Sequence, residues 1–204
     1  MSAWRMMRKV LRHPNDFYYD LQAPGMARWS HAILLILLAF AARMISILVT
    51  GYAFTTREAH EISFVYEFIW ISVPWITWSV SNWAVSTILD GEGKFKEIAV
   101  GSAYALVPYI VFIVPVTMLT NLLSLDESSA YELLLSAIFV WVILLMLIKV
   151  KILHDFEIGK VFWITVLTLI GVFIIWFVGI ILYGLIDEFV QFIFNLFQEI
   201  NFRM

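Results

Sequence analysis

The sequence feature that most limits the possible fold is a run of mainly apolar residues, 29–53, in which Arg43 is the only charged residue. About 20 apolar residues in a helix cross the hydrocarbon core of a bilayer, which is about 30 Å thick. A guanidinium inside that core costs roughly 2.5 kcal/mol or more on insertion scales, so it usually faces a partner, a cavity or the membrane surface. The run therefore predicts a membrane helix, and Arg43 needs a partner within the membrane.

Composition extends this prediction to the whole chain. Apolar residues make up 62% of the 204 residues and aromatic residues 17%, whereas globular domains are about half apolar. One integral membrane domain in contact with the lipid bilayer is therefore expected. The net charge of -3, with no basic tract beyond a short N-terminal cluster, argues against nucleic-acid binding. Cysteine is absent, which excludes disulfides, thiol nucleophiles and thiolate metal sites.

Apolar runs of similar length recur along the chain, separated by short polar loops. Because a chain in lipid must satisfy its backbone hydrogen bonds internally, and the runs lack strict alternation, they are expected to be helices. The predicted fold class is an all-α integral membrane protein, a bundle of five transmembrane helices with short loops and amphipathic terminal helices. The expected segments are a leader at 1–28, a membrane domain at 29–186 with spans at 29–53, 62–89, 98–125, 130–153 and 159–186, and a C-terminal helix at 187–204.

The positions of Lys and Arg predict how the chain crosses the membrane. Ten of the 13 basic residues fall on one side of the expected spans and only Arg57 and Arg203 on the other, with Arg43 inside the first span. By the positive-inside rule, the N-terminus, the second loop and the fourth loop are cytoplasmic, and the C-terminus is outside. The cytoplasmic set is Arg5, Arg8, Lys9, Arg12, Arg28, Lys94, Lys96, Lys149, Lys151 and Lys160.

Both termini are amphipathic. In the leader, Trp4, Met7 and Leu11 share one helical face and the basic residues point largely away. This pattern predicts a helix lying on an anionic leaflet, or else a disordered basic leader that only sets topology. After the last span an apolar stripe is expected to lie along the outer interface or to dock on a partner subunit. It consists of Phe189, Phe192, Ile193, Leu196, Phe197 and Ile200.

The second expected cytoplasmic loop, together with the helix after it, carries a family resemblance. Its sequence is Asp-Gly-Glu-Gly-Lys-Phe-Lys-Glu-Ile at 90–98, followed by Gly-Ser-Ala-Tyr-Ala-Leu-Val-Pro at 101–108. These residues resemble the signature of the Yip family of five-span membrane proteins, named for interaction with Ypt/Rab GTPases. The turn Glu-Ile-Gly-Lys at 157–160 is similar to the family's last cytoplasmic turn.

The resemblance implies a cytoplasmic N-terminus and a non-enzymatic role. Eukaryotic members carry a long N-terminal region implicated in GTPase contacts, whereas only residues 1–28 precede the first span here. Rab binding is therefore not carried over to this chain. The short leader looks more like the bacterial branch of the family. A bacterial plasma membrane is the expected location, with the Golgi or endoplasmic reticulum as the alternative.

Glu67 is the first candidate partner for Arg43. With antiparallel neighbouring helices, Arg43 lies about 15 Å and Glu67 about 8 Å from the outer ends of their spans, and a long Arg side chain snorkels outward to close the difference. An intramembrane ion pair that stabilises the fold is expected, and the alternative is an anion-binding or ion-translocating residue in a water-filled cavity. The other candidate partners are Asp187, Glu188 and Asn82.

Three prolines are expected to kink the second and third spans. Pro74 and Pro108 fall near the midplane and Pro115 further out, and each leaves a helical carbonyl without its N–H partner. Paired breaks of this kind mark binding sites in some transporters, but they are also ordinary kinks whose carbonyls are satisfied by nearby hydroxyls. Candidate hydroxyls are those of Ser72, Thr77, Ser79 and Thr117.

The loop at 90–97 is a candidate cytoplasmic docking surface. Gly91 and Gly93 permit tight turns, while Phe95 between Lys94 and Lys96 reaches the headgroup boundary and the two ammonium groups meet phosphate or a partner's carboxylates. The alternative is a plain hairpin between two spans. The loop lacks the G-x-x-x-x-G-K-(S/T) pattern, so it is not a phosphate-binding loop.

Enzyme chemistry finds little support in the sequence. The histidines form no metal-ligand spacing, no G-x-S-x-G motif occurs, and the cluster of His154, Asp155 and Glu157 is expected to be solvated. No catalytic residue, metal site or cofactor is predicted. The expected function is a scaffold or adaptor that binds membrane or peripheral proteins in trafficking or assembly. The alternative is a transporter or channel component with a cavity near Arg43 and the kinked second and third helices.

Overall fold

The computed structural model describes residues 3–55 and 57–203, and within these ranges it contains helices and no strand. The predicted all-α class is confirmed. The side chains of residues 59, 197 and 200–203 lie outside the described part, so Phe197 and Ile200 of the predicted stripe and the Arg203 side chain are not placed.

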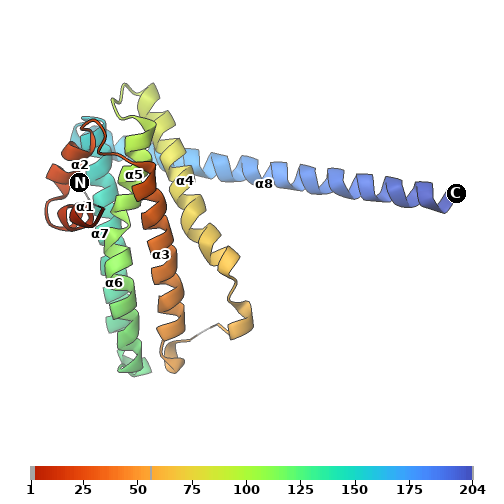
Figure 1. Ribbon diagram of the computed structural model, residues 1–204, viewed down its shortest axis with the longest axis horizontal. Coiled ribbons are helices and arrows are strands. Elements are labelled where there is room, and N and C mark those ends of the chain that lie inside the picture. The colour runs from red at the N-terminus through yellow and green to blue at the C-terminus, as the bar shows by residue number, and fades with distance from the viewer. Residues whose placement is uncertain (1–2, 56, 204) are drawn as a thin grey trace.

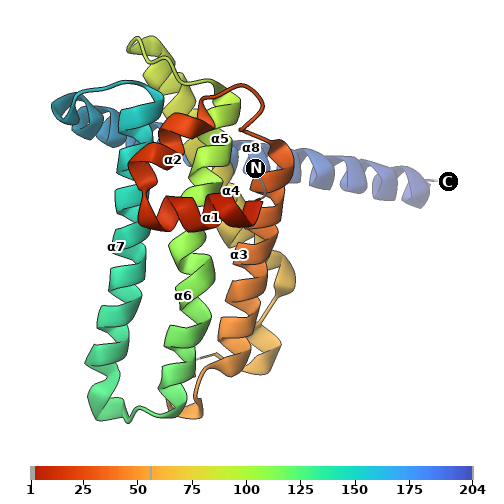
Figure 2. The same cartoon turned by 60° about the vertical axis from the view of Figure 1, so that its left-hand side comes forward.

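The bundle is built around a row of long helices (Figures 1 and 2). Helix α3 (Trp29–Val49), the end-to-end pair α5 (Phe95–Ala105) and α6 (Val107–Met118), and α7 (Ser128–Leu153) run side by side, with α6 packed between α3 and α7. Helix α4 (Phe64–Ile88) packs against α3 and α5. Short 3-10 turns complete the loops at the far end: η1 (Tyr52–Phe54), η2 (Ala59–Glu61), η3 (Leu119–Asn121) and η4 (Leu125–Glu127).

The expected third span is two helices rather than one. Helix α5 ends at Ala105, and Pro108 lies in the first turn of α6. Proline has no N–H to donate to the carbonyl four residues earlier, so the helix is interrupted there. Pro74 and Pro115, by contrast, lie inside the continuous helices α4 and α6. Of these three prolines, only Pro108 coincides with a helix boundary.

The leader is folded onto the bundle. Helices α1 (Ala3–Arg12) and α2 (Pro14–Leu21) contact α5 and α7 at one end of the row. Met6, Phe17 and Tyr18 are at most 2% exposed and belong to the main core, whereas Trp4 is 74% exposed. Of the three residues predicted to share an apolar face, Met7 and Leu11 pack on the core and Trp4 is exposed. The inward side of α1 therefore contacts the bundle. Residues 3–28 belong to the same packed unit as the helices that follow.

In helix α4 the distribution of polar and apolar side chains is the reverse of that in a helix of a water-soluble protein. All of its fully buried residues are polar, whereas many of its large apolar side chains are exposed. The buried set is Glu67, Thr77, Ser79, Ser81, Asn82 and Ser86. In lipid the apolar side faces outward and the polar side must find partners inside the bundle.

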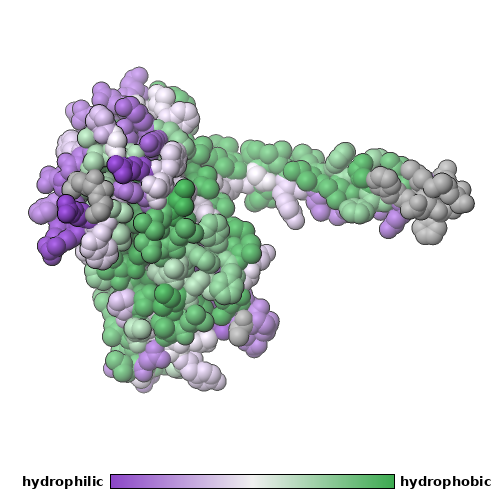
Figure 3. Space-filling model, in the orientation of Figure 1, coloured by the Kyte–Doolittle hydropathy of each residue, from purple (hydrophilic) through white to green (hydrophobic). Residues whose placement is uncertain are grey.

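Four stretches of helix within the described residues are long and apolar enough to cross a membrane: Trp29–Val49, Phe95–Asn121, Leu125–Leu153 and Ile158–Leu196. The predicted span at 62–89, which contains α4, is not among them. Its inward polar residues lower its average hydropathy, although its outer surface is apolar. Green apolar surface covers the bundle below the α1–α2 end in Figure 3.

Helix α8 (Ile158–Arg203) continues without a break through the regions expected as a fifth span and a separate C-terminal helix. Its first part packs against α4 and α7, and the rest projects away from the bundle, across the direction in which α3, α6 and α7 run (Figure 1). Gly171 allows the close approach to α4, because a Cβ there would lie 2.3 Å from the Ser81 Oγ. That hydroxyl donates to the Thr168 carbonyl at 2.7 Å.

Candidate functional site

Three charged side chains meet inside the bundle. The Arg43 Nε on α3 donates to the Glu67 Oε2 on α4 at 2.9 Å, and the Arg57 Nη1 from the connecting loop donates to the Glu67 Oε1 at 2.6 Å. The Glu67 side chain is 4% exposed, while those of Arg43 and Arg57 are 39% and 47% exposed. One buried carboxylate therefore receives two guanidinium groups, and the cluster carries an excess positive charge.

The structure brings together Arg43 and Glu67 of the sequence candidates, because α3 and α4 are joined by a short connection and pack side by side. Asp187 instead accepts from Gln191, and Asn82 bonds to other side chains deeper in the bundle. Arg57 was not predicted as a partner of Glu67, because its position in the sequence indicated only a cation outside the membrane. Its position in the loop that leads into α4 was the feature of the sequence that could have indicated a contact with Glu67.

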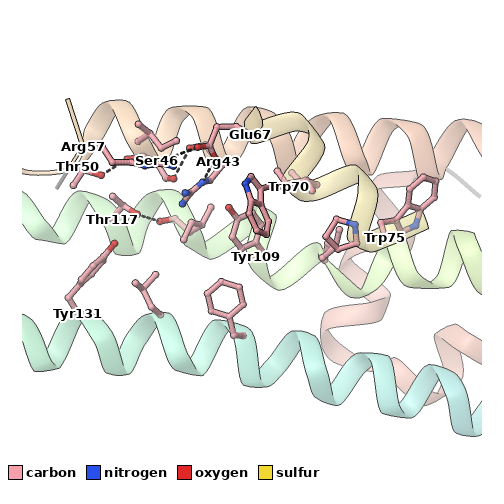
Figure 4. A pocket seen from close by; sticks show the side chains of 18 of the residues that line it. Arg43, Ser46, Thr50, Arg57, Glu67, Trp70, Trp75, Tyr109, Thr117 and Tyr131 are labelled. Atoms are coloured by element: carbon pink, nitrogen blue, oxygen red, sulfur yellow. Dashed lines mark hydrogen bonds and ion pairs between the residues drawn. The ribbon is translucent and has the colours of Figure 1, made fainter. Parts of the chain in front are cut away.

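A cavity of about 660 Å³ opens beside this cluster. Figure 4 shows its polar end, where Arg43, Arg57 and Glu67 lie with Thr50 and Tyr131, and the aromatic rings of Trp70 and Trp75 farther along it. The walls come from α3, α4, α6 and α7, with Leu106 between α5 and α6. The site is therefore an amphipathic cavity, cationic at one end and mainly apolar at the other.

The three prolines differ in their relation to this cavity. Pro74 lines it, and Pro108 and Pro115 are not among its lining residues. The expected hydroxyls do not satisfy the carbonyls freed by proline. The hydroxyls of Ser72, Thr77, Ser79 and Thr117 each donate to the carbonyl four residues before their own position.

A further basic side chain, that of Lys149, lies fully inside the bundle. Lys149 on α7 is 0% exposed, and its Nζ donates to the Asn82 Oδ1 and the Ser102 Oγ, both at 3.0 Å. It also lies 5.6 Å from the centre of the Trp78 ring, which lines the cavity. Lys149 was counted with the basic residues of the cytoplasmic side, and its burial inside the bundle was not predicted. Its spacing from Leu145 and Ile152, which share its helical face and are also buried, was the missed signal.

The loop at 90–97 is held rigidly by its glycines and its aromatic residue. A Cβ on Gly91 or Gly93 would lie 2.7 Å from an atom of the His154 ring, and the Gly93 N–H donates to the His154 Nδ1 at 3.3 Å. The Phe95 ring lies 6.0 Å from that of Trp29 and 5.7 Å from that of Trp83. The glycines therefore admit His154 as a buried packing partner.

His154 is 1% exposed, which corrects the expectation that it is solvated with its charged neighbours. Burial, together with the smaller effect of the nearby Lys149 ammonium, lowers the pKa of His154 to about 4. The ring stacks on Phe156. At neutral pH His154 is therefore a neutral structural group that fixes the loop.

Lys94 and Lys96 remain at the surface. With Glu97 and the turn at 22–27 they line a small groove of about 180 Å³. Figure 3 shows hydrophilic surface gathered at this end of the molecule, over α1 and α2. Among the described residues no group of three or more His, Cys, Asp or Glu side chains is placed to hold a metal ion.

The apolar helices, the apolar outer surface and the inward polar groups together define an integral membrane protein. The family model of the Yip1 domain matches residues 8–181, and the chain therefore belongs to the Yip1 family. The predicted family is confirmed by this match. Comparison with the curated proteins and with the solved structures gives no match.

Proposed function

We propose that the protein is a non-enzymatic adaptor whose polar end binds other membrane or peripheral proteins, in trafficking or assembly of membrane components. The observation that carries this proposal is the groove lined by Lys94 and Lys96. The loop behind it is anchored on His154 and between two tryptophan rings. A preorganised loop loses little conformational entropy when a partner binds.

The charge of this surface indicates the partner's chemistry. Arg5, Arg8 and Arg12 are exposed on α1 at the same end of the molecule, and Lys9 pairs with Asp20. Exposed cations steer an oppositely charged surface and set its orientation. An acidic segment of another protein is therefore the partner that suits the groove.

The proposed placement has five spans, with α4 as the additional one. The support is its exposed apolar side and its buried polar side. The excess of basic residues at the α1–α2 end favours a cytoplasmic location for that end and an outer location for the C-terminus. We further propose that the protein belongs to the bacterial branch of the family and lies in the plasma membrane, with the Golgi or endoplasmic reticulum as the alternative.

The adaptor role is tested by reversing the charge of the groove. Lys94→Glu with Lys96→Glu should reduce the partner proteins recovered with the tagged protein in mild detergent, while membrane insertion is unchanged. Lys151→Glu is the matched control, because Lys151 is exposed at the same end and does not line the groove. Equal partner recovery from the unmutated protein and the double variant would reject the proposed surface.

A transporter or channel component is the second candidate, favoured by the cavity beside Arg43 and Pro74. If it is correct, reconstituted vesicles show a protein-dependent flux of an anion, and Arg43→Leu abolishes that flux. Vesicles in which the unmutated protein supports no flux rule this candidate out.

A further inference from the structure

The polar end of the cavity has more hydrogen-bond donors than the protein satisfies. Each guanidinium has five N–H donors, whereas a carboxylate offers about four acceptor positions. Glu67 is the acidic residue lining the cavity and takes one bond from each arginine. The Tyr109 hydroxyl also lines the cavity and hydrogen-bonds Arg43. The hydroxyls of Ser46 and Thr117 donate to backbone carbonyls. None of these neutral groups offsets the charge of the second guanidinium. The remaining guanidinium N–H groups and the excess positive charge call for an anionic group.

The rest of the cavity suits an aliphatic chain. Its walls include Trp70, Leu106, Ile113, Phe139 and Met146. The Trp75 Nε1 donates to the Ala99 carbonyl at 2.9 Å, so its polar atom is already satisfied by the protein. The volume of about 660 Å³ falls within the roughly 300–1,000 Å³ typical of small-ligand sites.

We propose that this cavity binds an anionic amphiphile with a single acyl or alkyl chain. The carboxylate or phosphate head group lies against Arg43 and Arg57, and the chain extends along the tryptophan wall. Both arginines are partly exposed, so the head group has access to them. This inference does not depend on the adaptor role, and it names the ligand class of the cavity that the transport candidate uses.

The test measures equilibrium binding of radiolabelled palmitate to the full-length protein in nanodiscs of phosphatidylcholine. Saturable binding that hexadecanol and acetate fail to displace is expected, because the first lacks the anion and the second lacks the chain. Displacement by hexadecyl phosphate reports how the site ranks phosphate against carboxylate, and so distinguishes a lipid-like source from a free fatty acid. The proposal is overturned if hexadecanol or acetate displaces labelled palmitate as fully as unlabelled palmitate does. The absence of saturable palmitate binding overturns it as well.

Two variants locate the binding. Arg43→Gln should weaken palmitate binding about tenfold or more, since a hydrogen bond to a charged group is lost, whereas Arg5→Gln on the exposed face of α1 should not. If Arg43→Gln fails to fold, Leu135→Trp fills the cavity from α7, and its control is Val140→Trp on the exposed face of that helix. Unchanged binding in a folded Arg43→Gln variant and in Leu135→Trp overturns the assignment.

The palmitate-binding experiment can fail or succeed independently of the tests of the adaptor and transport proposals. The Lys94→Glu, Lys96→Glu variant should bind palmitate normally even when it loses its partners, because the groove and the cavity are separate sites. Binding without any flux in vesicles rejects transport and leaves the binding site in place.

Discussion

At the scale of single residues, the most consequential side chain is Glu67, which compensates two guanidinium groups. Its carboxylate is almost fully buried, whereas Arg43 and Arg57 are partly solvated. Losing one arginine leaves the carboxylate paired with the other. Losing the carboxylate leaves two like charges side by side with nothing between them.

Glu67→Gln is therefore expected to lower the free energy of unfolding by about 1–3 kcal/mol, and Arg57→Gln by less than about 1 kcal/mol because its pair is partly exposed. Unfolding in detergent, followed by circular dichroism, measures both. Glu132→Gln on the exposed side of α7 is the matched control. The expectation is that Glu67→Gln lowers the free energy of unfolding more than Arg57→Gln does. An Arg57→Gln variant that is less stable than the Glu67→Gln variant contradicts this expectation.

The presence of Arg57 also changes what a charge exchange should do. In Arg43→Glu with Glu67→Arg, the introduced guanidinium lies beside Arg57, which paired with the original carboxylate. Stability should therefore be restored only in part. Full restoration in the double variant, measured by the same unfolding assay, shows that Arg57 contributes no repulsion.

At the scale of elements, the loop between α4 and α5 and the turn between α7 and α8 form one packed unit through His154. The pKa of His154 is about 4 in the folded chain, against about 6.5 in an unfolded chain. Between these values the unfolded state binds the proton and the folded state does not, so stability falls as the pH is lowered.

Lowering the pH from about 7 to about 4 should reduce the free energy of unfolding through His154 by roughly 3 kcal/mol at most. His154→Asn retains an acceptor for the Gly93 N–H and should remove this part of the pH dependence. Denaturant unfolding at several pH values measures the difference, with His13→Asn on the surface as control. Parallel pH profiles for the unmutated protein and His154→Asn contradict the expectation.

The contact between α4 and α8 depends on Gly171. Gly171→Leu should separate the helices and lower the free energy of unfolding by about 1–3 kcal/mol, the usual cost of overpacking. Gly179→Leu is the matched control on the same helix, because a Cβ there has no atom within 4 Å. Thermal unfolding of the two variants provides the comparison, and equal stability of the two would show that the close approach is unimportant.

At the scale of the whole molecule, apolar side chains fill the core and also cover much of the outer surface, and in α4 the buried side is polar and the exposed side apolar. The loop before α4 and the loop after it lie at opposite ends of the bundle (Figure 1). If α4 crosses the bilayer, these two loops are on opposite sides of the membrane. If it does not, they share one side.

Because the sequence has no cysteine, single introduced cysteines report this arrangement. A thiol reagent that does not cross membranes should label His60→Cys and Asp126→Cys in intact cells, and Glu92→Cys and Glu157→Cys only after permeabilisation. All four positions are exposed. Equal labelling of His60→Cys and Glu92→Cys in intact cells excludes α4 as a fifth span.

Several features could be predicted without the structure because they depend on neighbours in sequence. The length and apolarity of the runs indicate membrane helices, and the residues at 90–108 indicate the Yip family. Arg43 and Glu67 could be suggested as partners because a short loop makes their helices adjacent. The cavity beside them could not be predicted, because its walls come from helices far apart in the chain.

The sequence alone was sufficient for the helical class, the family and the need to compensate Arg43, since hydropathy, motifs and charge are properties of the chain itself. Tertiary structure alone decided that Arg57 shares Glu67, that Lys149 is buried, and that Gly91 and Gly93 pack on His154. The physical reason is the solvent. Lipid allows the outer face of a helix to be as apolar as its inner face, so periodicity does not identify which side chains meet inside.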